Sequence, residues 1–301
     1  MTEAPPATEE GEAGSAPERR GPHLLLDLLV FPLVIVAVGV GVFVLFGLIT
    51  AEGKGPGDYL DLIRTGDSNR RWQAAFELSK VIQDRRSPEL SDPRLVGRMV
   101  SLFESADGDD PRVQRFLALA LGRLENAEAL PALLEYLRGV RRGEGGDSQT
   151  DIYAVWALGA IGADAAIPEL VILAAHEDPG LRKTAVHALG VFRSEAATAA
   201  LQGALGDPVD DVRWNAAMAL ARQGRSEAVP VLEQMLDRAQ LARNPAVTVD
   251  QTEEILLQAV AAAALVPDAR LAARLAELGD HDPSLRVRAA ARSGLEQQGP
   301  P

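Results

Sequence analysis

Cysteine is absent from the sequence, aromatic residues are scarce, and basic residues are outnumbered by acidic ones. Without cysteine the chain can form no disulfide and no thiolate metal site, and it has no thiol nucleophile. Only 4% of the 301 residues are aromatic although 47% are hydrophobic, so small and aliphatic side chains must supply most of the packing. Such side chains favour close helix–helix contacts over a thick sheet sandwich.

Charge and missing motifs exclude several kinds of partner and chemistry. The 30 basic and 43 acidic residues give a net charge of −13, which argues against binding to the phosphate backbone of nucleic acid. The sequence contains no Gly-rich phosphate-binding loop, no HExxH and no GxSxG. We therefore predict no catalytic residue, no cofactor and no metal.

The N-terminal region combines a polar tail with a long apolar run. Residues 1–22 are rich in Glu, Ala, Pro and Gly without apolar periodicity, which predicts a disordered acidic tail. Residues 28–50 follow, 23 residues with no ionisable side chain. As a helix this run is about 34 Å long, enough to cross a hydrocarbon core of ~30 Å, and it exceeds the ~7–15 apolar residues of a cleavable signal peptide. A buried core helix would show a polar face. We predict a transmembrane helix over 24–50.

Two details of this segment bear on topology. Ala37 and Gly41 form a small-xxx-small pair, which permits self-association of the transmembrane helix. After the span comes a Gly-rich hinge over 51–58. Basic residues near the span are more numerous on its C-terminal side (Lys54, Arg64, Arg70, Arg71) than on its N-terminal side (Arg19, Arg20). The positive-inside rule then predicts a single-pass membrane protein whose C-terminal domain faces the cytoplasm.

The stretch 178–190, DPGLRKTAVHALG, is typical of one amphipathic helix. Asp178 is an N-cap candidate, Pro179 suits the first helical turn, and Gly190 offers a stop. One helical stripe between them is apolar and consists of Leu181, Ala185, Val186 and Leu189. One such helix cannot bury its apolar face alone, so a repeated pattern implies stacking.

Relatives of this stretch recur in register, with alignment points at Ser79, Gly122, Gly159, Gly190, Ala221, Val266 and Gly294. A second helix follows each of the first six, and three of these second helices carry a proline suited to the first turn, at Pro131, Pro168 and Pro230. The longest intervals place insertions at about 84–92, 139–149 and 239–250. The sequence therefore predicts an all-α solenoid of about six to seven helical repeats over 59–298.

These residues resemble HEAT repeats, specifically the short variety first noted in phycobilin lyases. The shared pattern is Asp-Pro, then Val-Arg, then Ala residues leading to Ala-Leu-Gly, and the resemblance covers roughly 58–298. It implies a right-handed solenoid with first helices on the convex side and second helices on the concave side, and it implies protein–protein scaffolding. It also suggests an inter-repeat polar ladder, formed by Arg182, Arg213 and Arg286 with Asp178 and Asp282.

The function predicted is a membrane-anchored, non-catalytic scaffold or adaptor that binds partner proteins. One alternative is an enzyme or enzyme subunit of the bilin-lyase or deoxyhypusine-hydroxylase type. The hydroxylases resemble HEAT arrays with paired His-Glu motifs that hold two irons, but here only His176-Glu177 has that dipeptide. Another alternative is a regulatory subunit of a membrane complex. Trp72, Trp156 and Trp214 are candidate recognition aromatics, although the equivalent repeat positions of Trp72 and Trp214 favour packing.

A candidate partner-binding surface follows from counting along the second helices. Positions three and four after the proline should point toward the concave side, and they are occupied by Leu134, Glu135, Val171, Ile172, Gln202, Glu233 and Gln234. Three of them are apolar and adjacent, which indicates an apolar patch with Glu135 at its rim. The alternative is that packing between the second and third repeats buries this patch.

Overall fold

The computed structural model describes residues 33–42, 54–106, 110–144, 147–245 and 247–298. The chain divides into two units, 1–53 and 54–301. The predicted tail 1–22 lies outside the described residues, and so do residues 51–53 of the predicted hinge. The second half of that hinge is ordered, since helix α2 begins within it, at Pro56.

In the first unit, residues 33–42 form a helix whose side chains are all exposed. Across the described residues, none of the helices combines the length and the apolar character that crossing a membrane requires. This finding contradicts the predicted location, a single-pass membrane protein with cytoplasmic repeats. The remainder of the predicted segment 24–50 lies outside the described residues.

The second unit is a stack of helix pairs, and its described residues contain no strand. The first helices of the pairs are α3 Ser68–Asp84, α5 Pro111–Leu124, α7 Ser148–Ile161, α9 Pro179–Leu189, α11 Asp210–Arg222, α14 Val249–Ala263 and α16 Leu285–Gln298. The other layer contains α2 Pro56–Thr65, α4 Leu95–Ser105, α6 Leu130–Gly139, α8 Ile167–Leu173, α10 Glu195–Ala204, α12 Val229–Met235 and α15 Ala269–His281. A short helix, α13 Arg238–Leu241, lies in the predicted insertion after α12. The predicted all-α repeat solenoid is confirmed.

Local sequence explains where these helices start. The Asp178 side chain accepts hydrogen bonds from the backbone N–H groups of Gly180 (2.7 Å) and Leu181 (3.1 Å), and Pro179 occupies the first turn of α9. Proline likewise lies in the first turn of α6, α8 and α12. Helix α10 lacks it and is capped instead by Ser194, whose hydroxyl accepts from the N–H of Ala197. The predicted N-cap and first-turn residues are therefore confirmed.

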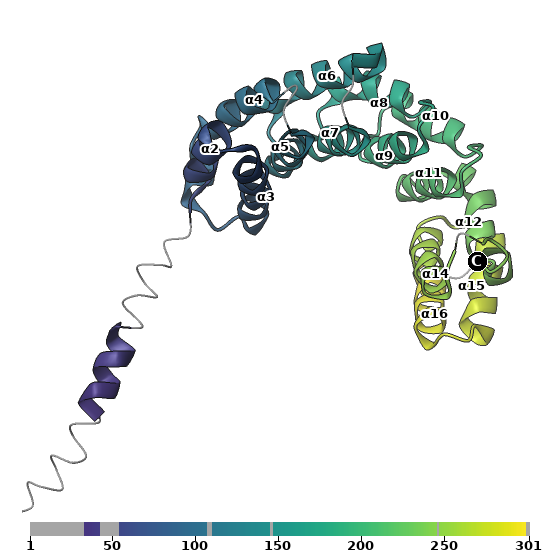
Figure 1. The fold of residues 1–301 in the computed structure, drawn as a ribbon. Helices are drawn as coiled ribbons and strands as arrows, with labels where there is room; N and C mark the ends of the chain where they lie inside the picture. Colours follow the sequence, from purple (N-terminus) through teal and green to yellow (C-terminus); the bar gives the residue numbers. More distant parts are fainter. Residues whose placement is uncertain (1–32, 43–53, 107–109, 145–146, 246, 299–301) are drawn as a thin grey trace, which may run out of the picture. The chain divides into compact units, whose positions relative to one another are not determined.

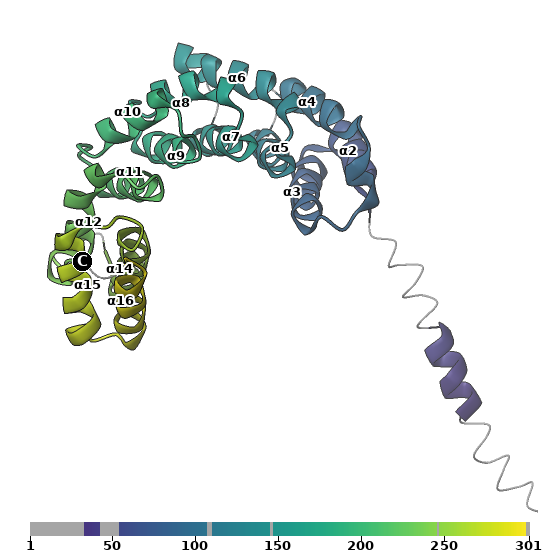
Figure 2. The same ribbon diagram turned by 180° about the vertical axis from the view of Figure 1, so that it is seen from behind.

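Within the second unit, the first helices line the inner side of the curve formed by α3 to α11, and the second helices line its outer side (Figure 1, Figure 2). We call these layers the inner row and the outer row. The expectation from the family resemblance was the reverse. The reason lies in residue size: a Cβ atom placed on Gly159 would lie 2.9 Å from the Cα of Ala188, and one on Gly122 only 2.8 Å from the Cα of Ala157.

Neighbouring inner helices therefore pack closely, whereas neighbouring outer helices touch much less. A row with closer spacing is shorter, so it takes the inside of the curve. Gly190 continues the series, because a Cβ there would lie 2.9 Å from the Cβ of Ala219. The small residues of the Ala-Leu-Gly motif thus set the curvature of the stack.

Arginine contacts connect some successive repeats, but their partners differ from the ladder that the resemblance suggested. Asp178 caps α9, and the carboxylate that pairs with Arg182 belongs to Asp207. Arg182 donates two hydrogen bonds to the Asp207 carboxylate, at 2.7 and 3.0 Å, and a third to the carbonyl of His176. Arg213 donates in the same way to the carbonyl of Asp207, six residues before it. In the last repeat the residue with this contact is Arg288, which reaches the Asp282 carbonyl.

Arg286, the residue predicted for this position, points elsewhere and pairs with Glu253 at 2.9 Å. Asp282 itself is buried and holds Arg238 through two hydrogen bonds of 2.8 Å. The last ladder contact therefore joins α16 to α13 through Asp282.

Candidate functional site

The inner row carries a hollow of about 680 Å³ between α11 and α14. This volume falls in the range of ligand pockets, roughly 300–1,000 Å³. The apolar part of its wall is made by Val209, Trp214, Met218, Met235, Val247 and Ile255. The polar part is made by Lys183, Asp210, Asp211, Asn215, Asn244, Gln251, Glu254 and Gln258. We call it the large hollow.

A second hollow of about 300 Å³ lies over α7 and α9. Its wall is mostly apolar and contains Leu119, Ile152, Tyr153, Trp156, Lys183, Thr184, His187 and Asn215. We call it the small hollow. Lys183 and Asn215 line both hollows, so the two adjoin along the inner row.

Most polar groups at the junction of the hollows are held in place. The Lys183 Nζ atom lies 3.0 Å from the Asp211 carboxylate, and the Asn215 amide donates to the Asp211 carbonyl at 2.7 Å. Asp210 is bound on both sides, by the Arg213 guanidinium and by the Asn244 amide, the latter at 2.7 Å. These contacts fix the side chains that the two hollows share.

Glu254 differs from the other carboxylates of the large hollow. Its side chain is exposed, and among the described residues no basic group forms an ion pair with it. The charged groups of this wall are the carboxylates of Asp210, Asp211 and Glu254 and the ammonium group of Lys183. The result is an excess of negative charge beside an apolar floor.

The large hollow exists because the chain is longer at this point. The predicted insertion 239–250 widens the step between α11 and α14, and it contributes Asn244 and Val247 to the wall. The Arg182–Asp207 contact fixes the loop before α11. Hydrogen bonds from the Arg182 guanidinium, more than any other effect, hold the pKa of Asp207 below its usual value. The insertion and the Arg182–Asp207 contact together fix the position of α11 between α9 and α14.

The residues that the sequence proposed for partner binding lie on the outer row, and none of them lines either hollow. Leu134 is buried in the core, and Val171 is partly buried against it. Ile172 is 46% exposed, so the three apolar residues do not form a continuous exposed patch. Leu134 is therefore buried by packing, as the alternative interpretation of the patch expected.

The polar members of that set make local contacts. Gln202 donates to Glu227 at 2.7 Å, and Glu233 pairs with Arg270 at 3.3 Å. Gln234 is exposed. None of the contacts made by the described residues tests binding, so the outer surface stays a prediction.

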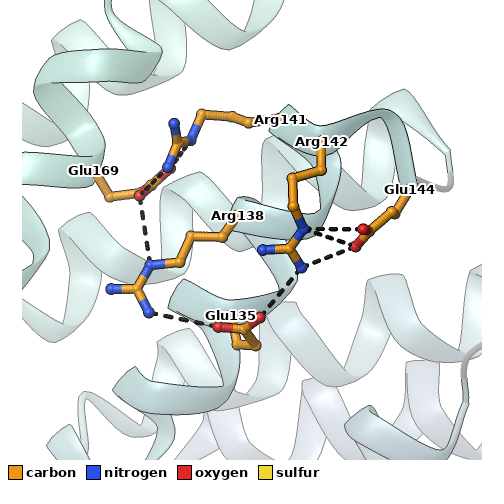
Figure 3. Close-up of polar contacts among 6 residues, drawn as sticks. All are labelled: Glu135, Arg138, Arg141, Arg142, Glu144 and Glu169. Atoms are coloured by element: carbon orange, nitrogen blue, oxygen red, sulfur yellow. Dashed lines mark hydrogen bonds and ion pairs between the residues drawn. The ribbon is translucent and has the colours of Figure 1, made fainter.

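Glu135, predicted at the rim of the patch, belongs to a charged network that spans α6, the turn after it and α8 (Figure 3). Its carboxylate lies 3.5 Å from Arg138 and 3.2 Å from Arg142. Arg142 also bonds Glu144, and this hydrogen bond lowers the pKa of the Glu144 carboxyl. Across the network, Arg141 donates to the buried Glu169 at 2.6 and 3.2 Å. The network fixes the start of the predicted insertion 139–149 to the outer row.

The His176-Glu177 pair has a structural role in this fold. The Nδ1 atom of His176 accepts a hydrogen bond of 3.0 Å from the backbone N–H of Asp178, which supports the cap of α9. Glu177 is exposed. In the described part of the chain, no group of three or more His, Asp or Glu side chains is placed to hold a metal ion.

Family comparisons agree with the repeat architecture. Residues 140–213 and 192–249 match the model for HEAT repeats, and residues 113–139 match the PBS lyase HEAT-like repeat. The chain thus contains HEAT repeats, as the sequence pattern indicated. No curated protein matches the chain in sequence.

Several solved structures of other proteins match the chain. The complex of CpcE and CpcF of phycocyanin lyase from Nostoc sp. matches at 20% identity, with 81% of this chain and 96% of that chain covered and a TM-score of 0.51. An archaeal HEAT-like repeat protein from Thermococcus onnurineus matches at 14% identity over 82% and 98%, with a TM-score of 0.45. Human deoxyhypusine hydroxylase matches at 17% identity over 81% and 95%, with a TM-score of 0.34. At such identities the likeness concerns the fold alone.

Sequence reasoning missed the two hollows as a site, although it noted two of their aromatic residues. Trp156 lines the small hollow, and Trp214, 9% exposed, forms part of the floor of the large one. Trp72 lies on α3 beneath the guanidinium of Arg112, 4.3 Å from the ring centre. The signal that could have located the large hollow is the long interval after Ala221, which marks the insertion.

Proposed function

We propose that the protein is a non-catalytic scaffold that binds a partner protein along the inner row of its repeats. The observation that carries this proposal is the pair of adjoining hollows, which together present apolar and polar side chains from α5, α7, α9, α11 and α14. A long mixed surface of this kind suits an extended chain segment better than a compact small molecule.

Two further observations support a binding role. The junction side chains are held by hydrogen bonds, so little side-chain freedom is lost when a partner binds. The phycocyanin lyase structure is a complex of two different chains, CpcE and CpcF, so a fold similar to this one takes part there in protein assembly. Concave faces of solenoids are common binding surfaces.

The proposal is tested by site-specific photo-crosslinking in cells that produce the full chain natively. A photoreactive amino acid replaces Gln258, which lines the large hollow, or Gln202, which lies on the outer surface predicted from the sequence. Both positions are exposed glutamines, so the replacements are matched. We expect a defined protein adduct from position 258 and none from position 202.

Adducts from position 202 alone would assign binding to the outer row instead. Absence of protein adducts at both positions would contradict the scaffold function. Mass spectrometry of the adduct from position 258 would identify the partner.

A further inference from the structure

We propose that the inner row recognises an extended peptide segment of the partner that presents a cationic side chain to the large hollow and an apolar side chain to the small hollow. This inference rests on the proposed function and adds the chemistry of the ligand. It follows from the charge and polarity of the two walls.

The large hollow suits a lysine or arginine side chain. Such a side chain has an apolar stem and a charged end, so it gains most from a wall that offers both kinds of contact. Trp214 and Met218 supply the apolar surface, and Glu254 supplies a carboxylate that no basic side chain of the described residues neutralises. An indole ring beside the hollow adds a favourable contact for a cation.

An acidic ligand group would meet the opposite conditions in the large hollow. The ammonium group of Lys183 is already engaged by Asp211 at 3.0 Å, and the Arg213 guanidinium is engaged by Asp210. A carboxylate entering beside Glu254 would therefore be repelled without gaining a free basic partner there. The net charge of −13 on the whole chain acts in the same direction, since it attracts basic segments at long range.

The small hollow suits an apolar side chain. Leu119, Ile152, Tyr153 and Trp156 make up most of its wall, and its volume is about 300 Å³. Burial of an aliphatic or aromatic side chain there is worth about 1.5–3 kcal/mol before ordering costs. His187 and Lys183 lie at its polar side, where they can face the backbone of the ligand.

The spacing between the two side chains of the ligand can be estimated from the repeat. The small hollow lies over α7 and α9, and the large one lies between α11 and α14. Packed helices are about 8–10 Å apart, so the hollows are about two helix steps, or roughly 16–20 Å, apart. An extended chain covers this distance in about five or six residues.

The test uses fluorescein-labelled synthetic peptides and the full chain, with binding followed by fluorescence anisotropy. The probes have a leucine and an arginine five residues apart, joined by Ser and Gly, in both sequence orders. Matched peptides replace the arginine with glutamate or the leucine with serine. We expect one order of the Leu–Arg peptide to bind, and each replacement to weaken binding about tenfold or more.

Two variants of the protein locate the cation. Glu254→Gln removes the carboxylate of the large hollow, and Glu195→Gln removes an exposed carboxylate from α10 in the outer row, so the net charge of both variants is the same. We expect Glu254→Gln to weaken the Leu–Arg peptide about three- to tenfold and Glu195→Gln to leave it unchanged. Thermal melting verifies that both variants are folded.

Equal binding of the arginine and glutamate peptides would overturn the inference, and so would equal effects of the two variants. These outcomes are distinct from failure of the scaffold function. A protein adduct at position 258 combined with no preference for the cationic peptide would retain the scaffold and reject the cation. Peptide binding without any protein adduct would reject the scaffold.

Discussion

The carboxyl groups of Asp151 and Asp207 are both largely shielded from solvent, yet their pKa values move in opposite directions. Burial raises the pKa of Asp151, and a 2.7 Å hydrogen bond from the Tyr136 hydroxyl only partly opposes this effect. Hydrogen bonds from the Arg182 guanidinium lower the pKa of Asp207 and outweigh its burial. The difference is the presence of a basic partner.

These shifts predict opposite effects of two isosteric substitutions. A raised pKa means that the charged Asp151 is unfavourable in the folded state above its folded pKa, so Asp151→Asn should stabilise the protein at pH 7 by on the order of 1 kcal/mol. The ionised Asp207 carboxylate stabilises the folded state at pH values above its unfolded pKa. Asp207→Asn should therefore destabilise the protein at pH 7 by about 2–3 kcal/mol.

Chemical denaturation of the full chain between pH 7 and about pH 3 measures both effects, because the contribution of Asp207 is lost only below its unfolded pKa of about 4. Each difference from the wild type should shrink as the pH falls. Asp151, whose folded pKa is raised, takes up its proton first in the folded state and then in the unfolded state, whereas Asp207, whose folded pKa is lowered, takes it up first in the unfolded state and then in the folded state. The same sign for both substitutions at pH 7 would contradict this account.

Single-residue predictions from the sequence succeeded where the contact is local. The caps at Asp178 and Pro179 depend on neighbouring backbone groups, and both were predicted. The ladder arginine of the last repeat was misplaced by two residues, because Arg286 and Arg288 both follow Asp282 and only the start of α16 distinguishes them. Leu134 is buried although the helical stripe placed it on the exposed side, because a stripe does not show how closely neighbouring helices pack.

At the scale of helices, the close contact between α7 and α9 gives a sharp prediction. Gly159→Ala places a Cβ 2.9 Å from the Cα of Ala188, where backbone must shift. Alanine is the better helix former by about 1 kcal/mol, but the overpacking should outweigh this gain and leave the variant about 1–3 kcal/mol less stable. Urea denaturation measures the difference.

Gly203 provides the matched control, because it also lies in a helix, α10, and nothing lies within 4 Å of a Cβ added there. Gly203→Ala should therefore stabilise the protein by about 0.5–1 kcal/mol. Stabilisation by Gly159→Ala as well would show that the two helices can separate freely.

Helix order and most helix starts were predictable, but the sixth repeat was not placed correctly. Its alignment point, Val266, lies beyond α14, which ends at Ala263. This repeat lacks the Arg of the pattern, and its preceding insertion hides the start of the helix. The insertion itself was predicted, but the hollow that it opens depends on how α11 and α14 pack around Asn244 and Val247.

For the second unit as a whole, stability should vary along the stack. Repeats contact only their neighbours, so helices with neighbours on both sides are held most firmly. We expect amide protons of α7 to exchange more slowly than those of α2 and α16 in hydrogen-exchange mass spectrometry. Equal protection along the unit would indicate a single cooperative fold.

The sequence predicted the repeat architecture of this unit but not the side on which each row lies. Hydrophobic periodicity shows which face of a helix is buried, whereas curvature depends on the difference in spacing between two rows. That difference is fixed by contacts such as Gly159 to Ala188, which join residues of neighbouring repeats and which no pattern within a single helix reveals. The apolar run 28–50 is long enough to cross a membrane, but no helix among the described residues combines the required length and apolar character.

The glycine–alanine contacts of the inner row also make the unit mechanically asymmetric. Helices that already meet at Gly122, Gly159 and Gly190 have no space left to approach one another, so compression of the curve meets steep repulsion at once. Extension only separates the inner contacts and lets the loosely packed outer helices close up. We expect opening of the unit around a bulky ligand to cost less free energy than tightening around a thin one.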